Sequence, residues 1–115
     1  MSDVAPWTIQ LKKGIAEYIV LVTLADKEAY GYEILQALMQ VDHLAFGEST
    51  VYPILGRLCH DGHLAVRVAN SEKGPPRRYY KLTSSGKDRL HEMDKCWKGL
   101  VKSIEYTREG KHNEQ

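Results

Sequence analysis

Basic side chains gather in one short segment of this 115-residue sequence. Residues 65–81 contain five Lys and Arg residues but only one acidic residue, which gives the segment a net charge of +4. The basic residues are Arg67, Lys73, Arg77, Arg78 and Lys81. Guanidinium and ammonium groups at this density attract phosphate chains, because each can neutralise one phosphate and release its counterion. The segment therefore predicts a site for a polyanion.

The charge of the whole chain conceals this segment. The sequence contains 16 Lys and Arg against 15 Asp and Glu, and its net charge of +1 would by itself argue against a nucleic-acid partner. Residues 1–64 hold four basic and eight acidic groups, a net charge of −4, and residues 83–115 carry +1. The positive field is therefore local and lies beside an acidic remainder.

A second group of polar side chains shares one side of a predicted helix. Apolar residues recur at i, i+3, i+4 and i+7, which is typical of a helix with one buried stripe. The stripe consists of Val51, Ile54, Leu55 and Leu58. At about 100° per residue, the opposite side presents Ser49, Pro53, Gly56, Arg57 and His60. These side chains allow close approach, and Arg57 can reach a phosphate or a guanine edge.

The ends of this helix follow from its special residues. We expect it to begin near Ser49 or Thr50, either of which can cap it, because Pro53 is best accommodated in the first turn. We expect it to end at Asp61, with Gly62 as the left-handed residue that follows.

Other chemistry finds little support in the sequence. Cys59, His60 and His63 suggest zinc, but two neighbouring residues and one further His do not supply four ligands at a known spacing. No nucleophile–base pair, carboxylate pair or phosphate-binding loop is evident, so we expect no enzyme activity, metal or cofactor. The two cysteines, Cys59 and Cys96, lack a disulfide framework and are expected to be reduced thiols.

We expect the protein to be cytoplasmic and to have no membrane partner. The longest strongly apolar run, residues 19–24, is far shorter than the ~20 residues of a membrane-spanning helix. The first residues lack the basic start and apolar stretch of a signal peptide.

The remaining elements follow from periodicity. Apolar spacings of three and four predict helices over residues 9–24, where Leu11, Ile15, Ile19 and Val22 recur, and over about 30–41. Alternation then predicts a strand over 64–69, and residues 78–82 are expected to form its returning partner. The two strands are expected to form a hairpin with a long basic tip.

A last helix is expected from Thr83, which can cap it, to about Tyr106. Its apolar residues have a/d heptad spacing, which is typical of a helix that packs against another helix. They are Leu90, Met93, Trp97, Leu100 and Ile104. We expect this seam to form a homodimer interface, with Leu11 and Ile15 of the first helix joining it.

The order helix, helix, helix, hairpin predicts a mainly α fold with a small β-hairpin, a winged helix-turn-helix extended by a long C-terminal dimerisation helix. In such folds the third helix enters the major groove of DNA and the hairpin contacts the backbone. The predicted DNA contacts are Ser49, Thr50, Tyr52, Pro53, Arg57, Lys73, Arg77 and Arg78. We expect a DNA-binding domain over residues 1–82, the dimerisation helix over 83–108 and a flexible tail over 109–115.

The sequence resembles the PadR-like family of bacterial transcriptional regulators over nearly its whole length. Three segments carry the resemblance: residues 11–15 with 30–34, residues 49–62, and the Gly-Pro-Pro-Arg-Arg-Tyr-Tyr-Lys-Leu-Thr stretch of 74–83. The resemblance implies a homodimer that binds pseudo-palindromic operator DNA, usually as a repressor that a small molecule releases.

Trp97 is the residue to which the resemblance gives a ligand role. In some short relatives a tryptophan at the matching position lines a pore between protomers and stacks on flat aromatic molecules. Trp97, with Met93 and Leu100 beside it, would then bind a planar aromatic effector. Alternatively, Trp97 is packing within the dimer interface, as aromatic residues at helical spacing usually are.

A competing hypothesis for the whole chain is a protein-interaction module. Winged helices also serve as docking domains without a role on DNA, and the sequence pattern of the fold is the same in both cases. Binding to a specific duplex and to a random one distinguishes the two hypotheses.

Overall fold

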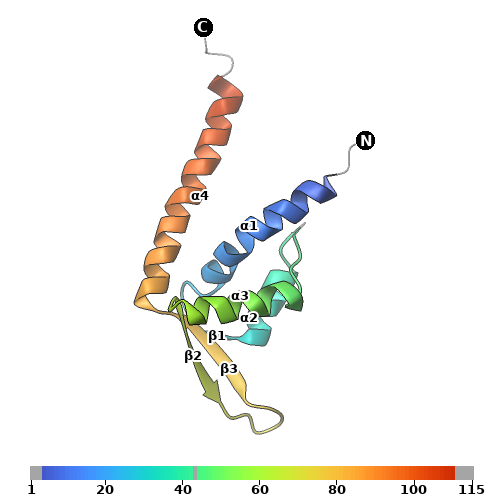
Figure 1. Ribbon diagram of the computed structural model, residues 1–115, viewed down its shortest axis with the longest axis vertical. Helices are drawn as coiled ribbons and strands as arrows, with labels where there is room; N and C mark the ends of the chain where they lie inside the picture. Colours follow the sequence, from blue (N-terminus) through green and yellow to red (C-terminus); the bar gives the residue numbers. More distant parts are fainter. Residues whose placement is uncertain (1–3, 43, 111–115) are drawn as a thin grey trace.

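The computed structural model describes residues 4–42 and 44–110, which form four helices and a three-stranded antiparallel sheet. Helices α1 (Ala5–Thr23), α2 (Gly31–Met39) and α3 (Glu48–His60) build the body of the molecule. Helix α4 (Ser84–Gly110) and the outer part of α1 extend from one end of this body, and the β-hairpin projects from the other (Figure 1). This is the mainly helical fold with a small sheet that the sequence predicts.

The hairpin pairs β2 (Leu64–Ala69) with β3 (Arg77–Leu82), in a register that runs from Leu64 opposite Leu82 to Ala69 opposite Arg77. We call residues 64–82 the wing. A short strand β1 (Ala29–Tyr30) pairs with the other edge of β3, giving the order β1-β3-β2. Two residues are too few to produce an alternating pattern, so β1 was not predicted.

The core lies where α1, α2 and α3 meet the base of the sheet. The predicted stripe of α3 is buried as expected, and Ile34, Leu35 and Leu38 of α2 pack against it. Phe46, in the connection between α2 and α3, is 1% exposed and closes this core. Leu64, Tyr80 and Leu82 of the wing belong to the same core, so packing fixes α3 and the wing relative to each other.

The predicted inner face of α1 is only partly correct. The residues of this helix that become buried are Ala16, Val20 and Leu21, whereas Val22 is 47% exposed. Leu11 and Ile15 are half-buried and line a cavity beside α4. The helix is contacted by α2, α3 and α4 at different points along its length, so no single stripe describes its buried residues.

The start of α3 differs from the prediction. The helix begins at Glu48, with Gly47 as the N-terminal flanking residue and no side-chain cap from Ser49 or Thr50. Pro53 is consequently in the second turn, where its missing N–H removes the helical hydrogen bond to the Ser49 carbonyl. The end was predicted correctly, because Gly62 follows with φ +83°.

The outer half of the wing is more exposed than its alternating pattern suggests. Leu64 is buried, but Val66 and Val68 are 41% and 59% exposed. The strands continue past the short β1 into solvent, so no second layer covers their apolar side chains. The tip turns at Gly74, whose φ of +117° suits glycine.

Helix α4 begins as the sequence predicts. The Thr83 hydroxyl oxygen accepts a hydrogen bond from the Gly86 amide at 3.0 Å and donates one to the Gly62 carbonyl at 2.7 Å. The helix ends at Gly110, so residues 109 and 110 of the expected tail are helical. The other tail residues, 111–115, lie outside the described residues. No helix among the described residues is long and apolar enough to span a membrane.

Candidate nucleic-acid interface

A groove of about 740 Å³ lies between the wing, the start of α2 and the middle of α3. Its wall is formed by Tyr30, Gly31, Tyr32, Tyr52, Gly56, Ser71, Lys73, Pro75, Pro76, Arg77, Arg78 and Tyr80. Three of these residues are basic and none is acidic, so the charged side chains of the groove wall are all cations. Aromatic rings and hydroxyls supply the remaining surface, and such a groove fits a phosphate backbone.

The structure brings some of the predicted DNA-contact residues into this groove. Tyr52 from α3 and Lys73, Arg77 and Arg78 from the wing all line it, and these four side chains are exposed. Gly31 permits the close crossing of α2 and α3, because a Cβ at this position would lie 3.3 Å from the Tyr52 ring.

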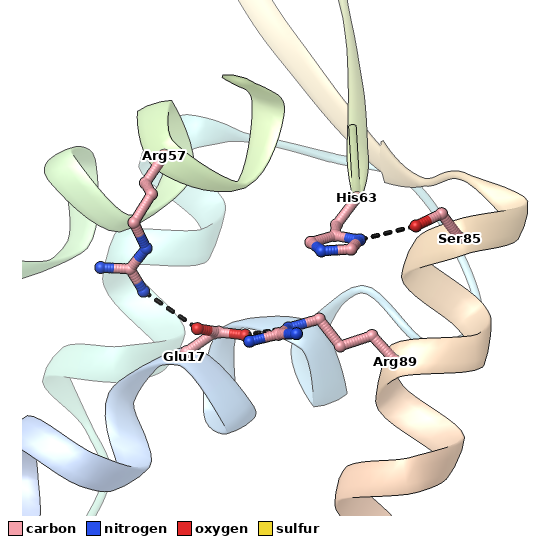
Figure 2. A network of polar contacts seen from close by, with 5 residues as sticks. All are labelled: Glu17, Arg57, His63, Ser85 and Arg89. Atoms are coloured by element: carbon pink, nitrogen blue, oxygen red, sulfur yellow. Dashed lines mark hydrogen bonds and ion pairs between the residues drawn. The ribbon is translucent and has the colours of Figure 1, made fainter. Parts of the chain in front are cut away.

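The other predicted contacts lie outside the groove wall. Ser49 and Pro53 are exposed and Thr50 is half-buried on α3. Arg57 forms an ion pair with Glu17 of α1, with 2.9 Å between Nη2 and Oε1. Its guanidinium group is therefore directed toward α1 (Figure 2).

Aromatic rings hold two arginines of the wing strands. The guanidinium of Arg77 lies 4.5 Å from the centre of the Tyr30 ring, and that ring is 5.6 Å from the ring of Tyr79. On the far side of Tyr79, Arg67 stacks at 4.5 Å and also binds Glu28. The hydrogen bonds that Arg67 donates to the Glu28 carboxylate raise the pKa of Arg67, so its charge is fixed but already paired. Stacking of this kind restrains Arg77 without neutralising it.

Tyr30 and Tyr32 line the groove although they are not among the predicted DNA contacts. Tyr32 is 56% exposed, and its ring stacks on Tyr30 with 6.5 Å between the ring centres. The signal in the sequence was the Tyr-Gly-Tyr spacing, in which two rings flank a glycine at the start of a helix. Strand alternation places one of the neighbouring residues Tyr79 and Tyr80 in the core, and the structure buries Tyr80.

A second cavity of about 340 Å³ lies between α1 and α4. It is lined by Gln10, Leu11, Gly14, Ile15, Tyr18, Met93, Cys96, Trp97 and Leu100. The three predicted effector-binding residues are therefore all in its wall. The Trp97 and Tyr18 rings are tilted, with 6.1 Å between their centres. The Tyr18 hydroxyl donates a 2.6 Å hydrogen bond to Asp94, which raises the pKa of Tyr18 to about 12.

The apolar seam of α4 divides into two parts. Leu90 is buried in the core and Met93 packs against it, so these two residues contact their own chain. Trp97, Leu100 and Ile104 are 38%, 50% and 46% exposed. The outer half of the seam is therefore the apolar surface that remains available for a second chain.

The suggested zinc ligands do not come together. Within residues 4–42 and 44–110, no group of three or more His, Cys, Asp and Glu side chains could hold a metal ion. Cys59 is half-buried, and this burial raises the pKa of its thiol. His63 instead contacts the Ser85 hydroxyl at 2.7 Å, which connects the start of the wing to α4 (Figure 2).

Three helices, a wing with a basic groove and an extended last helix define a protein of the winged helix-turn-helix class. A sequence model of the transcriptional regulator PadR-like family matches residues 20–92. The chain belongs to this family. Its members are transcriptional regulators and not enzymes, which confirms the predicted family and the expectation that the protein is not an enzyme.

Solved structures of the family superimpose on most of the chain. A PadR-like transcription factor from Bacteroides fragilis is 38% identical and has a TM-score of 0.73. The match covers 85% of this chain and 94% of that chain. A PadR family regulator from Eggerthella lenta is 31% identical, with coverages of 97% and 93% and a TM-score of 0.76. An uncharacterized protein of Lysinibacillus sphaericus is 31% identical over 100 residues, which are 85% of this chain and 92% of that protein.

A further relative was solved with its nucleic-acid partner. Bacillus subtilis PadR, in complex with operator DNA, is 27% identical and has a TM-score of 0.64. The match covers 69% of this chain and 46% of that longer chain.

Proposed function

We propose that this regulator is a homodimeric repressor that binds operator DNA through α3 and the wing. The observation that carries the proposal is the groove between α3 and the wing, which is lined by Lys73, Arg77 and Arg78 and by no acidic residue. The operator complex of Bacillus subtilis PadR supports the same partner. Arg77 and Arg78 contact the phosphate backbone, and the exposed side of α3 reads the major groove.

Binding to the promoter of its own gene tests the DNA-binding proposal. Fluorescence anisotropy with this duplex and with a random duplex of equal length should show at least ~10³-fold tighter specific binding. Equal, weak affinity for both duplexes would contradict the proposal and favour the protein-interaction module. Reduced transcription from this promoter in the presence of the protein distinguishes a repressor from an activator.

The homodimer is proposed from the outer half of α4. Trp97, Leu100 and Ile104 form an exposed apolar row on a helix that extends away from the body. A row of this kind is expected to pack against a second helix with the same spacing. Two copies of the chain would also present two grooves, which matches the two half-sites of a palindromic operator.

The effector is proposed to be a planar aromatic molecule in the cavity between α1 and α4. The volume of about 340 Å³ is within the range of small-molecule sites, and the Trp97 and Tyr18 rings supply aromatic faces. In a Trp7→Phe background, Trp97 is the remaining tryptophan of the two in the sequence. Its fluorescence should then be quenched by planar aromatics, from phenolic acids to fused tricyclic dyes.

The same compounds should weaken binding to the promoter duplex. A Trp97→Leu variant that still binds DNA, but no longer responds to any quenching compound, would support the effector site. No quenching across the panel would assign Trp97 to packing within the dimer.

A further inference from the structure

One carboxylate of α1 holds two arginines that come from different elements. Glu17 accepts a hydrogen bond from Arg57 of α3 at Oε1, 2.9 Å long, and one from Arg89 of α4 at Oε2. Figure 2 shows the two guanidinium groups meeting at Glu17 from opposite sides. The Glu17 side chain is only 15% exposed, so water competes weakly for these contacts.

Glu17 is ionised in this arrangement. Partial burial acts to raise the pKa of its carboxyl group, but the hydrogen bonds and charges of Arg89 and Arg57 outweigh burial and lower it. The negative charge of Glu17 is therefore present throughout the neutral pH range. Two cations share it.

Arg57 lies at the edge of the side of α3 that is exposed. At about 100° per residue, Ser49, Pro53 and Gly56 lie near the middle of this side and Arg57 lies roughly 80° from Ser49. The side chain of Arg57 is 55% exposed, yet its guanidinium group turns to α1. Within the described part of the chain, no carboxylate pairs with Arg77 or Arg78 of the wing. The cation on α3 is thus restrained by an anion, unlike these two cations of the wing.

We propose that Glu17 restrains DNA binding by competing with backbone phosphates for Arg57. This inference rests on the proposed function, because it requires a phosphate backbone beside α3. Arg57 can bind a phosphate fully only after it leaves Glu17, since both partners are anions that would repel each other at one guanidinium group. Glu17 thereby sets the affinity below the value that the cations of α3 and the wing would otherwise give.

Arg89 connects this restraint to the helix that lines the second cavity. It binds the other oxygen of Glu17, and the neighbouring residue Tyr18 contacts Asp94 and Trp97 of α4. A shift of α4 relative to α1 would therefore change the contact of Arg89 with the carboxylate that also holds Arg57. The restraint lies on a direct route between the cavity and α3.

A double-mutant cycle on the promoter duplex tests the proposal. Glu17→Gln removes the anion at nearly constant shape, and it should raise affinity about three- to tenfold by freeing one arginine for a charge-assisted hydrogen bond. The slope of log K against log salt should become steeper by about 0.9 per protomer, as expected for one added phosphate contact. In an Arg57→Ala background, the same substitution should change neither quantity.

Glu17→Asp is the matched control for charge. It keeps the negative charge but withdraws the carboxylate by one methylene, so it should also raise affinity, by less than Glu17→Gln does. It also keeps the proposal testable if Glu17→Gln lowers the melting temperature. Each variant is compared with the wild type by circular dichroism before DNA is added.

The outcomes separate this inference from the proposed function. An unchanged or reduced affinity of both Glu17 variants, with normal wild-type binding, would overturn the restraint alone. An equal gain in the Arg57→Ala background would also overturn it, because Glu17 would then act through overall charge. A wild-type protein that binds no duplex would overturn the proposed function itself.

Discussion

The arginines of this protein differ in whether a carboxylate of the same chain pairs with them, and therefore in how available their charge is to DNA. Arg67 is paired with Glu28 and Arg57 with Glu17, whereas Arg77 rests on the Tyr30 ring and lines the groove. The net charge of +4 in residues 65–81 therefore overstates the positive potential of the wing, since Glu28 neutralises Arg67 from outside that segment. The sequence shows where the cations are, but the neighbouring side chains determine which of these cations can bind a phosphate.

The Tyr18–Asp94 hydrogen bond makes a residue-scale prediction about stability. Tyr18→Phe should lower the free energy of unfolding by about 1 kcal/mol at pH 7, because Asp94 loses a hydrogen-bond donor. The pKa of Tyr18 is raised to about 12, above its unfolded value of about 10. The stabilisation is therefore complete below pH 10 and is lost as the pH rises through 12.

Urea unfolding of the wild type and of Tyr18→Phe between pH 7 and pH 12 checks this predicted pH dependence. The difference in unfolding free energy should be constant up to about pH 10 and then shrink. Tyr106→Phe is the matched control, since Tyr106 is 69% exposed on the same helix as Asp94. Equal stability of wild type and Tyr18→Phe at pH 7 would contradict the assigned role of the hydrogen bond.

At the scale of elements, the closest approach that a glycine permits lies between Gly86 of α4 and the backbone of His63, just before the wing. A Cβ on Gly86 would lie 2.0 Å from the His63 carbonyl oxygen, the same oxygen that accepts the Thr83 amide at 3.1 Å. Because the obstacle is backbone, Gly86→Ala must displace α4 from the start of β2. We expect it to lower the free energy of unfolding by about 1–3 kcal/mol.

Gly99→Ala supplies the comparison in the same helix. Apart from its two chain neighbours and the local helix backbone, no atom lies within 4 Å of its Cβ position, so the higher helix propensity of alanine should stabilise the protein by roughly 0.5–1 kcal/mol. Urea unfolding at one protein concentration measures both variants. Similar effects of the two substitutions would contradict a close joint at Gly86.

The elements with long periodic patterns were the ones that the sequence predicted well. The buried stripe of α3, the Thr83 cap of α4 and the pairing of the two wing strands all follow from local spacing. The buried face of α1 and strand β1 did not follow, because tertiary neighbours determine them and no local period encodes them. The start of α3 was missed since Gly47 flanks it where a side-chain cap was expected.

The candidate site was predictable to a similar extent. The predicted wing cations Lys73, Arg77 and Arg78 share the groove because charge density is visible in the sequence, and Tyr52 lines the groove with them. The pairing of Arg57 was not, because Glu17 lies 40 residues earlier on another helix. Tyr30 was missed because its role depends on stacking with Arg77 and Tyr79 across the sheet.

The whole molecule is elongated, measuring 66 × 36 × 20 Å along its principal axes. Much of the length comes from α4, which extends from the body on the side opposite the wing (Figure 1). An isolated helix of this kind gains little from its own apolar row in water, whereas pairing with a second copy would bury it. The shape thus favours an assembly in which the last helices meet and the wings lie outside.

Leu100→Glu tests this assembly at the molecular scale. Leu100 is 50% exposed in the apolar row, and a carboxylate there would have to be buried in the proposed interface. Sedimentation velocity should show a dimer for the wild type and a monomer for the variant. Lys102 lies about 200° around the helix from Leu100, so the Lys102→Glu variant should remain a dimer. A dimer that persists in Leu100→Glu would contradict an interface built on this row.

The central claim is that the groove between α3 and the wing binds the DNA backbone, and the salt dependence of binding tests it most directly. Affinity for the promoter duplex is measured across a salt series for the wild type, for Arg77→Ala/Arg78→Ala, and for Lys98→Ala/Lys102→Ala as the charge-matched control on α4. The wing variant should bind all duplexes more weakly, with a slope flatter by about two units per protomer. The α4 variant should keep the wild-type slope. A wing variant that retains both the affinity and the slope of the wild type would contradict the claim.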